Sequence, residues 1–304
     1  MSWAATEFES LDLGDPRRNR RAIRLMEKLS AKPTASIPGA CGDWADTIGT
    51  YRFFSNEEVE WPAILAPHVQ NSVTRMAAHD VVLCIQDITE LDFNGQMASG
   101  LGLLSYEAQR GMYAHPTYAV STSREPLGVI DAWMWTRELK DKDGYRAGIK
   151  ESVRWIEGYE RLAEMAELVP ATRLVYLADR EADIMALMVR ARDLATPVDW
   201  LLRSKHHRTL SGGDKLWSTV TEGESLGEIG FTLPQRQGSR AREVMQEVWA
   251  QTLSLTRWQK RLGAGHLPGG QRNAATRGRQ GRGVATTDEF SSCDARSGCK
   301  NDPD

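Results

Sequence analysis

Two aspartates follow two apolar runs of the sequence at equivalent positions. The run at 81–85 ends in Gln86 and Asp87, and Asp179 comes after residues 173–178. Runs of this kind predict strands that are buried on both faces. If both strands lie in one sheet, the two carboxylates converge at its carboxyl edge, where they can bind a divalent cation. Oxygen ligands suit Mg²⁺ or Mn²⁺, and such ions assist displacement at phosphodiesters. Taken singly, an aspartate after a strand is often only a turn former or a helix cap.

The segments around these aspartates predict an α/β unit. We expect strands at residues 81–85, 115–123 and 127–135, the three forming an antiparallel meander. A helix over 144–168, a strand over 173–178, a helix over 180–192 and a strand over 198–203 follow. Short strands at 216–220, 229–233 and 244–249 then indicate a β insertion or a β extension.

The first 78 residues have helical spacing instead. Asp15 and Pro16 predict the start of a helix that ends near Ser30, and further helices are expected at 43–54 and 61–78, with a loop over 33–42. The helix from Pro16 carries six cations, which are Arg17, Arg18, Arg20, Arg21, Arg24 and Lys28, opposed within it by Glu27 alone. A solvated surface rarely needs so many like charges, so the pattern favours contact with DNA phosphates.

Composition narrows the class of protein. The chain has 304 residues, a net charge of −3 and four scattered cysteines. It has no apolar run near the ~20 residues of a membrane-spanning helix. These features predict a reducing, cytoplasmic location with no membrane partner. Residues 257–304 are rich in glycine and arginine without hydrophobic periodicity, which predicts disorder.

Several motifs resemble one known family. Residues 177–184, LADREADI, resemble the D-R-E-A-D signature of bacterial insertion-sequence transposases of the DDE class. LGDPRR at 13–18 and YRF at 51–53 resemble the DNA-binding domain of that family, IQDIT at 85–89 its first catalytic aspartate, and RSKH at 203–206 a further segment. The likeness covers about residues 3–255 and is greatest to the branch of cut-and-paste transposases of composite transposons.

The resemblance implies a fold and a division into domains. The fold is an N-terminal helical DNA-binding domain, residues 1–78, followed by a ribonuclease H-like mixed-sheet core, residues 79–210. A partial β insertion spans 211–256, and the predicted disordered tail spans 257–304.

The resemblance also implies a site and partners. Asp87 and Asp179 are then the catalytic residues and ligands of Mg²⁺ or Mn²⁺, and Arg203 and Lys205 face the DNA. The partner is double-stranded DNA at transposon ends, bound by a homodimer or by a heteromer with the full-length transposase.

One catalytic ligand of the family lacks a counterpart. The family glutamate lies in a Y-x2-R-x3-E-x6-K pattern, but no tyrosine follows Tyr176, and Glu289, the one glutamate after Trp249, has different neighbours. We therefore expect a copy that is frameshifted and truncated after about residue 256, with one sheet face left exposed.

Three functional hypotheses remain open. The first is an active DDE transposase. The second, which we favour, is a protein that binds DNA but cannot cut it, because two carboxylates leave the metal site without its third ligand. The third is an active metal-dependent nuclease or transposase in which Glu181 or Asp183 substitutes for the missing glutamate.

Overall fold

The computed structural model describes residues 2–95, 98–146, 149–196, 198–235 and 238–255, together with a strand at Gly283–Thr286. The chain divides after Leu201 into two compact units, one built mainly from residues 1–201 and the other mainly from the residues that follow.

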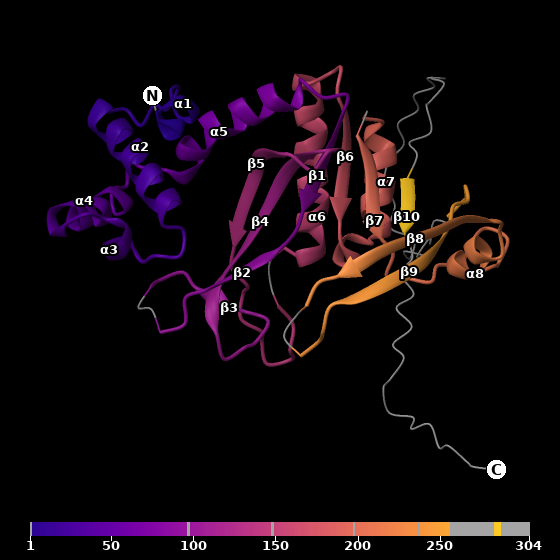
Figure 1. Cartoon of the computed structure of the whole chain (residues 1–304). Coiled ribbons are helices and arrows are strands. Elements are labelled where there is room, and N and C mark those ends of the chain that lie inside the picture. The colour runs from indigo at the N-terminus through magenta and orange to yellow at the C-terminus, as the bar shows by residue number, and fades with distance from the viewer. Residues whose placement is uncertain are drawn as a thin grey trace, which may run out of the picture. The chain divides into compact units, whose positions relative to one another are not determined.

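The first unit begins with five helices (Figure 1). They are α1 (Trp3–Glu7), α2 (Pro16–Ala31), α3 (Ile37–Ala40), α4 (Trp44–Phe54) and α5 (Trp61–Met76). The predicted start of α2 is confirmed, because the Asp15 side chain accepts a hydrogen bond from the Arg17 amide and Pro16 occupies the first turn. The loop predicted over 33–42 is wrong in part: Ser36 caps the short helix α3, which includes Pro38 in its first turn. Phe8, Leu25 and Phe53 belong to the hydrophobic core of these helices.

A mixed sheet follows the helices. Its strands are β1 (Val81–Gln86), β2 (Thr89–Asp92), β3 (Gly102–Leu103), β4 (Arg110–Ser121), β5 (Pro126–Trp135), β6 (Arg173–Ala178), β7 (Asp199–Arg203) and β10 (Gly283–Thr286). The main strands lie in the order β5-β4-β1-β6-β7, with β1 and β4 antiparallel and β1 and β6 parallel. The predicted mixed α/β architecture with N-terminal helices is thus confirmed, and β2 and β3 are strands that the sequence pattern did not indicate.

Two helices interrupt the later strands at places that differ from the prediction. Helix α6 (Glu151–Met165) begins seven residues after the predicted start at Gly144, and Ile149 is exposed instead of packed. The predicted helix over 180–192 is two elements, the short η2 (Arg180–Ala182) and α7 (Met185–Leu194). The residues between them, Asp183 and Ile184, leave the helical backbone region, so the chain turns before α7 starts.

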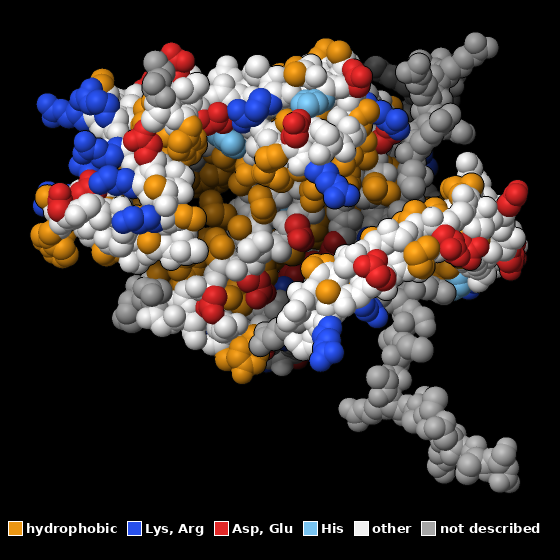
Figure 2. Space-filling model, in the orientation of Figure 1, with side chains coloured by type: hydrophobic (Ala, Val, Ile, Leu, Met, Phe, Trp, Pro, Cys, Tyr) orange, Lys and Arg blue, Asp and Glu red, His pale blue; other side chains and the backbone are white. Residues whose placement is uncertain are grey.

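The prediction that β1 is buried on both faces is wrong. Val82, Cys84 and Gln86 are buried, whereas Ile85, on the opposite face, is 38% exposed, and so is Tyr118, its register partner on β4. Alternation of this kind arises because the face that carries Gln86 packs against α6, including Gly158, while Ile85 faces away. Figure 2 shows hydrophobic side chains exposed over this sheet.

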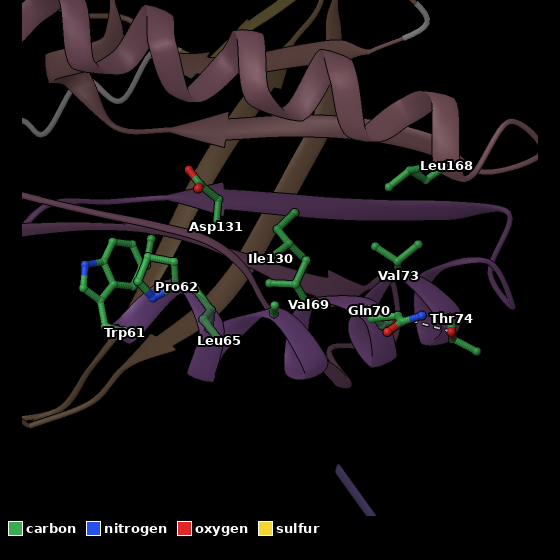
Figure 3. Close-up of a pocket in the computed structure, with 12 residues that line it drawn as sticks. Trp61, Pro62, Leu65, Val69, Gln70, Val73, Thr74, Ile130, Asp131 and Leu168 are labelled. Atoms are coloured by element: carbon green, nitrogen blue, oxygen red, sulfur yellow. Dashed lines mark hydrogen bonds between the residues drawn. The ribbon is translucent and has the colours of Figure 1, made fainter. Parts of the chain in front are cut away.

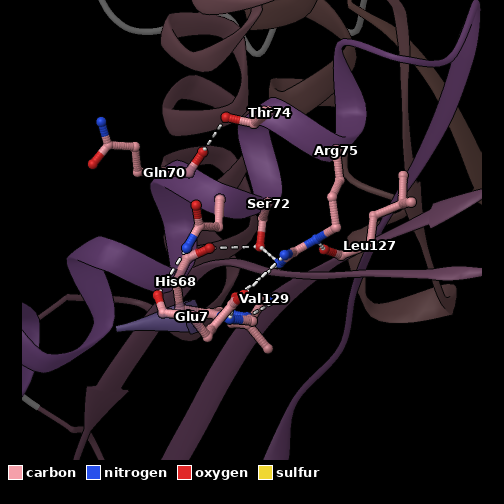
Figure 4. A network of polar contacts seen from close by, with 9 residues as sticks. Glu7, His68, Gln70, Ser72, Thr74, Arg75, Leu127 and Val129 are labelled. Carbon is pink, nitrogen blue, oxygen red and sulfur yellow. Dashed lines mark hydrogen bonds and ion pairs between the residues drawn. The ribbon is translucent and has the colours of Figure 1, made fainter. Parts of the chain in front are cut away.

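A polar network joins the N-terminal helices to the edge strand β5 (Figure 4). Glu7 of α1 accepts hydrogen bonds from both terminal nitrogens of Arg75 of α5 and lies 2.6 Å from His68 Nδ1. The Arg75 Nε donates to the Leu127 carbonyl, and His68 Nε2 accepts from the Val129 amide at 2.9 Å. The pKa of Glu7 is lowered, mainly by the hydrogen bond from Arg75. These contacts hold the helices and the sheet together within the first unit.

The second unit contains a short helix and a hairpin. The helix α8 (Leu216–Thr221) stands where a strand was predicted over 216–220, and the antiparallel pair β8 (Ser225–Leu233) and β9 (Arg242–Trp249) confirms the two later strands. The hydroxyl groups of Thr219 and Thr221 donate hydrogen bonds to backbone carbonyls one turn earlier, so these polar side chains are hydrogen-bonded within the helix.

Two predictions concern the remaining segments. Of the tail predicted to be disordered, residues 257–304, only the strand Gly283–Thr286 is described, and Glu289 lies outside the described residues. Within the described part of the chain, no helix is both long enough and apolar enough to cross a membrane.

Candidate nucleic acid interface and carboxylate pair

The arginines of α2 divide into an outward row and an inward pair. Arg17, Arg20 and Arg24 are exposed and lie three and four residues apart, so they project from one side of the helix. None of the three forms an ion pair with a residue that the structure describes. Such a row of guanidinium groups is the arrangement that phosphate groups of a duplex favour.

Other cations of α2 hold the helical region together. Arg21 donates to Asp46 at 2.9 Å, and Lys28 forms an ion pair with the other carboxylate oxygen of Asp46. Asp46 is 8% exposed, and the hydrogen bond from Lys28 is the largest cause of its lowered pKa. A Cβ atom at Gly49 would lie 2.8 Å from the Arg21 guanidinium, so the absence of a side chain there lets Arg21 reach Asp46. Arg21 therefore ties α2 to α4, and its predicted DNA contact stays a prediction.

Arg18 has a similar local role. Its guanidinium donates to the Leu13 carbonyl at 3.0 Å and lies 3.9 Å from the Glu58 carboxylate. The spacing of charges along the helix does not distinguish Arg18 and Arg21 from the outward row. Their partners come from other elements, and residue spacing within α2 does not reveal them.

The sheet brings the backbones of Asp87 and Asp179 to one edge. The last paired residues of the parallel strands β1 and β6 are Gln86 and Ala178, and each aspartate is the next residue. Both aspartates are exposed, and neither forms an ion pair with a residue that the structure describes. The convergence expected from the sequence is thus present at the level of the strand register.

Each carboxylate already accepts one backbone hydrogen bond. The Ile88 amide donates to Asp87 Oδ1 at 2.8 Å, and the Glu181 amide donates to Asp179 Oδ1 at 2.7 Å, which makes Asp179 the cap of η2. Capping and metal binding are compatible, because a carboxylate has a second oxygen. Two hard oxygen donors fit a magnesium ion that fills its other positions with water or substrate phosphate.

The described residues supply no third protein ligand for a metal at this pair. Among the residues that the structure describes, no group of three or more His, Cys, Asp or Glu side chains could hold a metal ion. Of the two substitutes considered, Glu181 is exposed, whereas Asp183 is 4% exposed and faces the interior. Glu181 is therefore the more accessible of the two.

The segment from Arg203 to Arg208 belongs to the second unit. Arg203 ends β7 and is half-buried, and Lys205 is exposed. His207 stacks on Trp217 with ring centroids 4.7 Å apart, and the Ser204 hydroxyl accepts from the Trp217 indole nitrogen. These contacts give the segment from Arg203 to Arg208 a defined conformation. The DNA contacts of Arg203 and Lys205 stay predictions.

A groove of the first unit contains none of the predicted site residues. It has a volume of about 620 Å³ and lies between α5 and β5, with Trp61, Val69 and Ile130 among its walls (Figure 3). The lining is mainly apolar, and its carboxylate, Asp131, pairs with Arg161. This groove has no group suited to phosphodiester chemistry.

One family of known proteins matches the N-terminal helical region. Residues 1–59 match the family of transposase DNA-binding domains. Two solved structures show weak likeness, the Mos1 strand transfer complex (12% identity, TM-score 0.23, 63% of this chain and 59% of that chain) and a pre-cleavage Mos1 transpososome (11% identity, TM-score 0.22, 64% of both chains). The chain thus spans less than two thirds of either Mos1 chain. The N-terminal region, residues 1–59, carries the sequence pattern of a transposase DNA-binding domain.

Proposed function

We propose that this chain is a transposase-lineage protein that binds double-stranded DNA at transposon ends and does not complete DNA cleavage. The observation that carries the proposal is the outward row Arg17, Arg20 and Arg24, which lies within the region that matches transposase DNA-binding domains. Arg18 and Arg21 contribute indirectly to the same surface. Their hydrogen bonds to Leu13 and Asp46 hold α2, the helix that carries the outward row, in place.

A salt titration of DNA binding tests this surface. Replacing Arg17, Arg20 and Arg24 by glutamine should weaken binding and reduce the slope of log K against log salt by about 0.9 for each phosphate that is no longer neutralised. A control variant replaces Arg110, Arg124 and Arg192, which are also exposed, and so changes the net charge equally. Equal slopes for the two triple variants would contradict the proposed DNA surface.

The carboxylate pair is the proposed remnant of a cleavage site. Asp87 and Asp179 would hold one Mg²⁺ or Mn²⁺, and a bound ion supplies charge stabilisation to the oxygens of a phosphodiester under attack. The strand order β5-β4-β1-β6-β7, with β5, β4 and β1 antiparallel in turn and β6 parallel to β1, supports a ribonuclease H-like core. On this view residues 79–210 form the core, with the partial insertion at 211–256.

The missing third carboxylate is the reason for proposing that cleavage is lost. In-line displacement depends on close positioning of the metal and the reacting oxygens, and a missing ligand loosens both. The sequence carries no Y-x2-R-x3-E-x6-K pattern, which also supports a frameshifted copy that departs from its family after about residue 256. Such a chain would act by occupying transposon ends, as a homodimer or together with the full-length transposase.

An active nuclease remains the alternative function. The exposed Glu181, two residues after Asp179, is the observation that favours it. Replacing Glu181 by glutamine would then abolish any cleavage that the wild-type protein performs, whereas the proposed function expects no cleavage to abolish.

A further inference from the structure

The buried side chain of Gln86 touches the strand that carries the second aspartate. The Tyr176 hydroxyl of β6 donates to Gln86 Oε1 of β1, and both residues are buried. Burial raises the pKa of the Tyr176 phenol, so it stays a hydrogen-bond donor at all physiological pH values. Asp87 follows Gln86 directly, and Asp179 lies three residues after Tyr176.

Backbone pairing alone holds the two aspartates loosely. The β1–β6 ladder ends at Gln86 and Ala178, one residue before the carboxylates. On its other side, the Asp87 amide reaches the Pro116 carbonyl at 3.5 Å, a long contact. Strand ends open more easily than strand centres, so a side-chain link at the last pair adds a restraint where the ladder supplies little.

Helix α6 presses on the same side chain. A Cβ atom at Gly158 would lie 1.9 Å from Gln86 Nε2, so only glycine lets the helix approach this closely. Within the described residues Gln86 Nε2 has no hydrogen-bond partner, and Thr117, its register partner on β4, is also without one at Oγ1. The single hydrogen bond to Tyr176 therefore sets the orientation of the amide.

We propose that Tyr176 and Gln86, packed beneath Gly158, are positioning residues that set the spacing between Asp87 and Asp179. The inference rests on the proposed function for its metal-binding consequence, but not for the strand geometry itself. A buried amide oxygen without a donor is costly, and the Tyr176 hydroxyl removes that cost for Gln86 Oε1 only when the two strands bring these side chains together.

The test compares two tyrosine-to-phenylalanine variants, each of which loses one buried hydroxyl group. Tyr176→Phe removes the hydroxyl that contacts Gln86, and Tyr159→Phe removes a buried hydroxyl that donates to the Val198 carbonyl instead. Two readouts are recorded for each protein: the backbone amide shifts of Asp87, Ile88 and Glu181, and the affinity for Mn²⁺ alone by water-proton relaxation.

Tyr176→Phe should move these amide shifts and weaken Mn²⁺ binding by about two- to tenfold, the value of one hydrogen bond. Tyr159→Phe should do neither, although it loses a buried hydroxyl as well. Gly158→Ala, which displaces Gln86 from the other side, should reproduce the amide shifts. Equal behaviour of the two tyrosine variants would overturn the inference. If the wild-type protein binds no Mn²⁺, the proposed metal site fails, and the amide shifts still decide the positioning role.

Discussion

Replacing His115 by leucine should make the stability of the protein less dependent on pH in the acid range. His115 lies on β4 at 1% exposure, with its ring 4.4 Å from the Trp155 ring and with neither ring nitrogen hydrogen-bonded within the described residues. Burial, with a smaller effect from the nearby Arg161 and Arg154, lowers the pKa of His115 from 6.5 to about 4. The folded protein therefore keeps this imidazole neutral where the unfolded chain protonates it.

The sign and size of the effect follow from proton linkage. Above pH 6.5 the residue is neutral in both states and stability is fully present. As pH falls from 6.5 towards 4, the unfolded chain binds a proton that the folded protein does not, so stability falls by up to 1.4 kcal/mol per pH unit, or about 3 kcal/mol in all. Below pH 4 the folded protein also binds the proton, and the loss levels off.

Urea unfolding at several pH values between 4 and 7.5 measures this effect. The difference in unfolding free energy between wild type and His115→Leu should change by about 3 kcal/mol across the range, with leucine favoured at the acid end. His206→Leu, at an exposed position, is the control for loss of a histidine. A difference that does not vary with pH would refute the buried, neutral state of His115.

Three further predictions concern packing and polar contacts. Asp46→Asn should lower the free energy of unfolding by about 1–2 kcal/mol at neutral pH, because the contact with Lys28 loses its charge. The destabilisation, measured by urea unfolding, should become smaller as pH falls through the lowered pKa of Asp46, since the wild-type carboxylate is then protonated as well. His68 should show the neutral tautomer protonated at Nδ1 in nitrogen NMR spectra, because its Nε2 accepts from the Val129 amide; a proton on Nε2 would contradict the network. Gly158→Ala should lower the melting temperature, with an unfolding cost of about 1–3 kcal/mol from overpacking, and an unchanged melting temperature would contradict the close approach of α6.

The sequence predicted elements whose signals are local. Asp15 and Pro16 mark the start of α2 by capping chemistry that involves neighbouring residues only. The strands β1 and β6 were predicted from continuous apolar runs, and their parallel pairing places the two aspartates as expected. The same rule misjudged burial on β1, because α6 packs on the face that carries Gln86, whereas Ile85 on the opposite face is 38% exposed.

Features that depend on distant partners were not predictable. The short alternating pattern at 216–220 predicts a strand, yet the segment forms the helix α8. Strand preference depends on tertiary neighbours, which a local pattern does not contain. The inward role of Arg21 requires Asp46 and the small Gly49 on another helix. The hydrogen bond between Gln86 and Tyr176 joins residues that are 90 positions apart, so no local sequence pattern predicts it.

The central claim is that the chain binds DNA ends without cutting them. Purified protein is incubated with DNA carrying a transposon end in the presence of Mg²⁺ or Mn²⁺, beside an Asp87→Ala variant, and the DNA is examined both for a mobility shift and for nicks at the end. We expect the wild-type protein to shift the DNA and to leave the strands intact, with the same result for Asp87→Ala. Site-specific nicks made by the wild-type protein and absent with Asp87→Ala would contradict the account, because they would show that two carboxylates suffice or that another residue replaces the third.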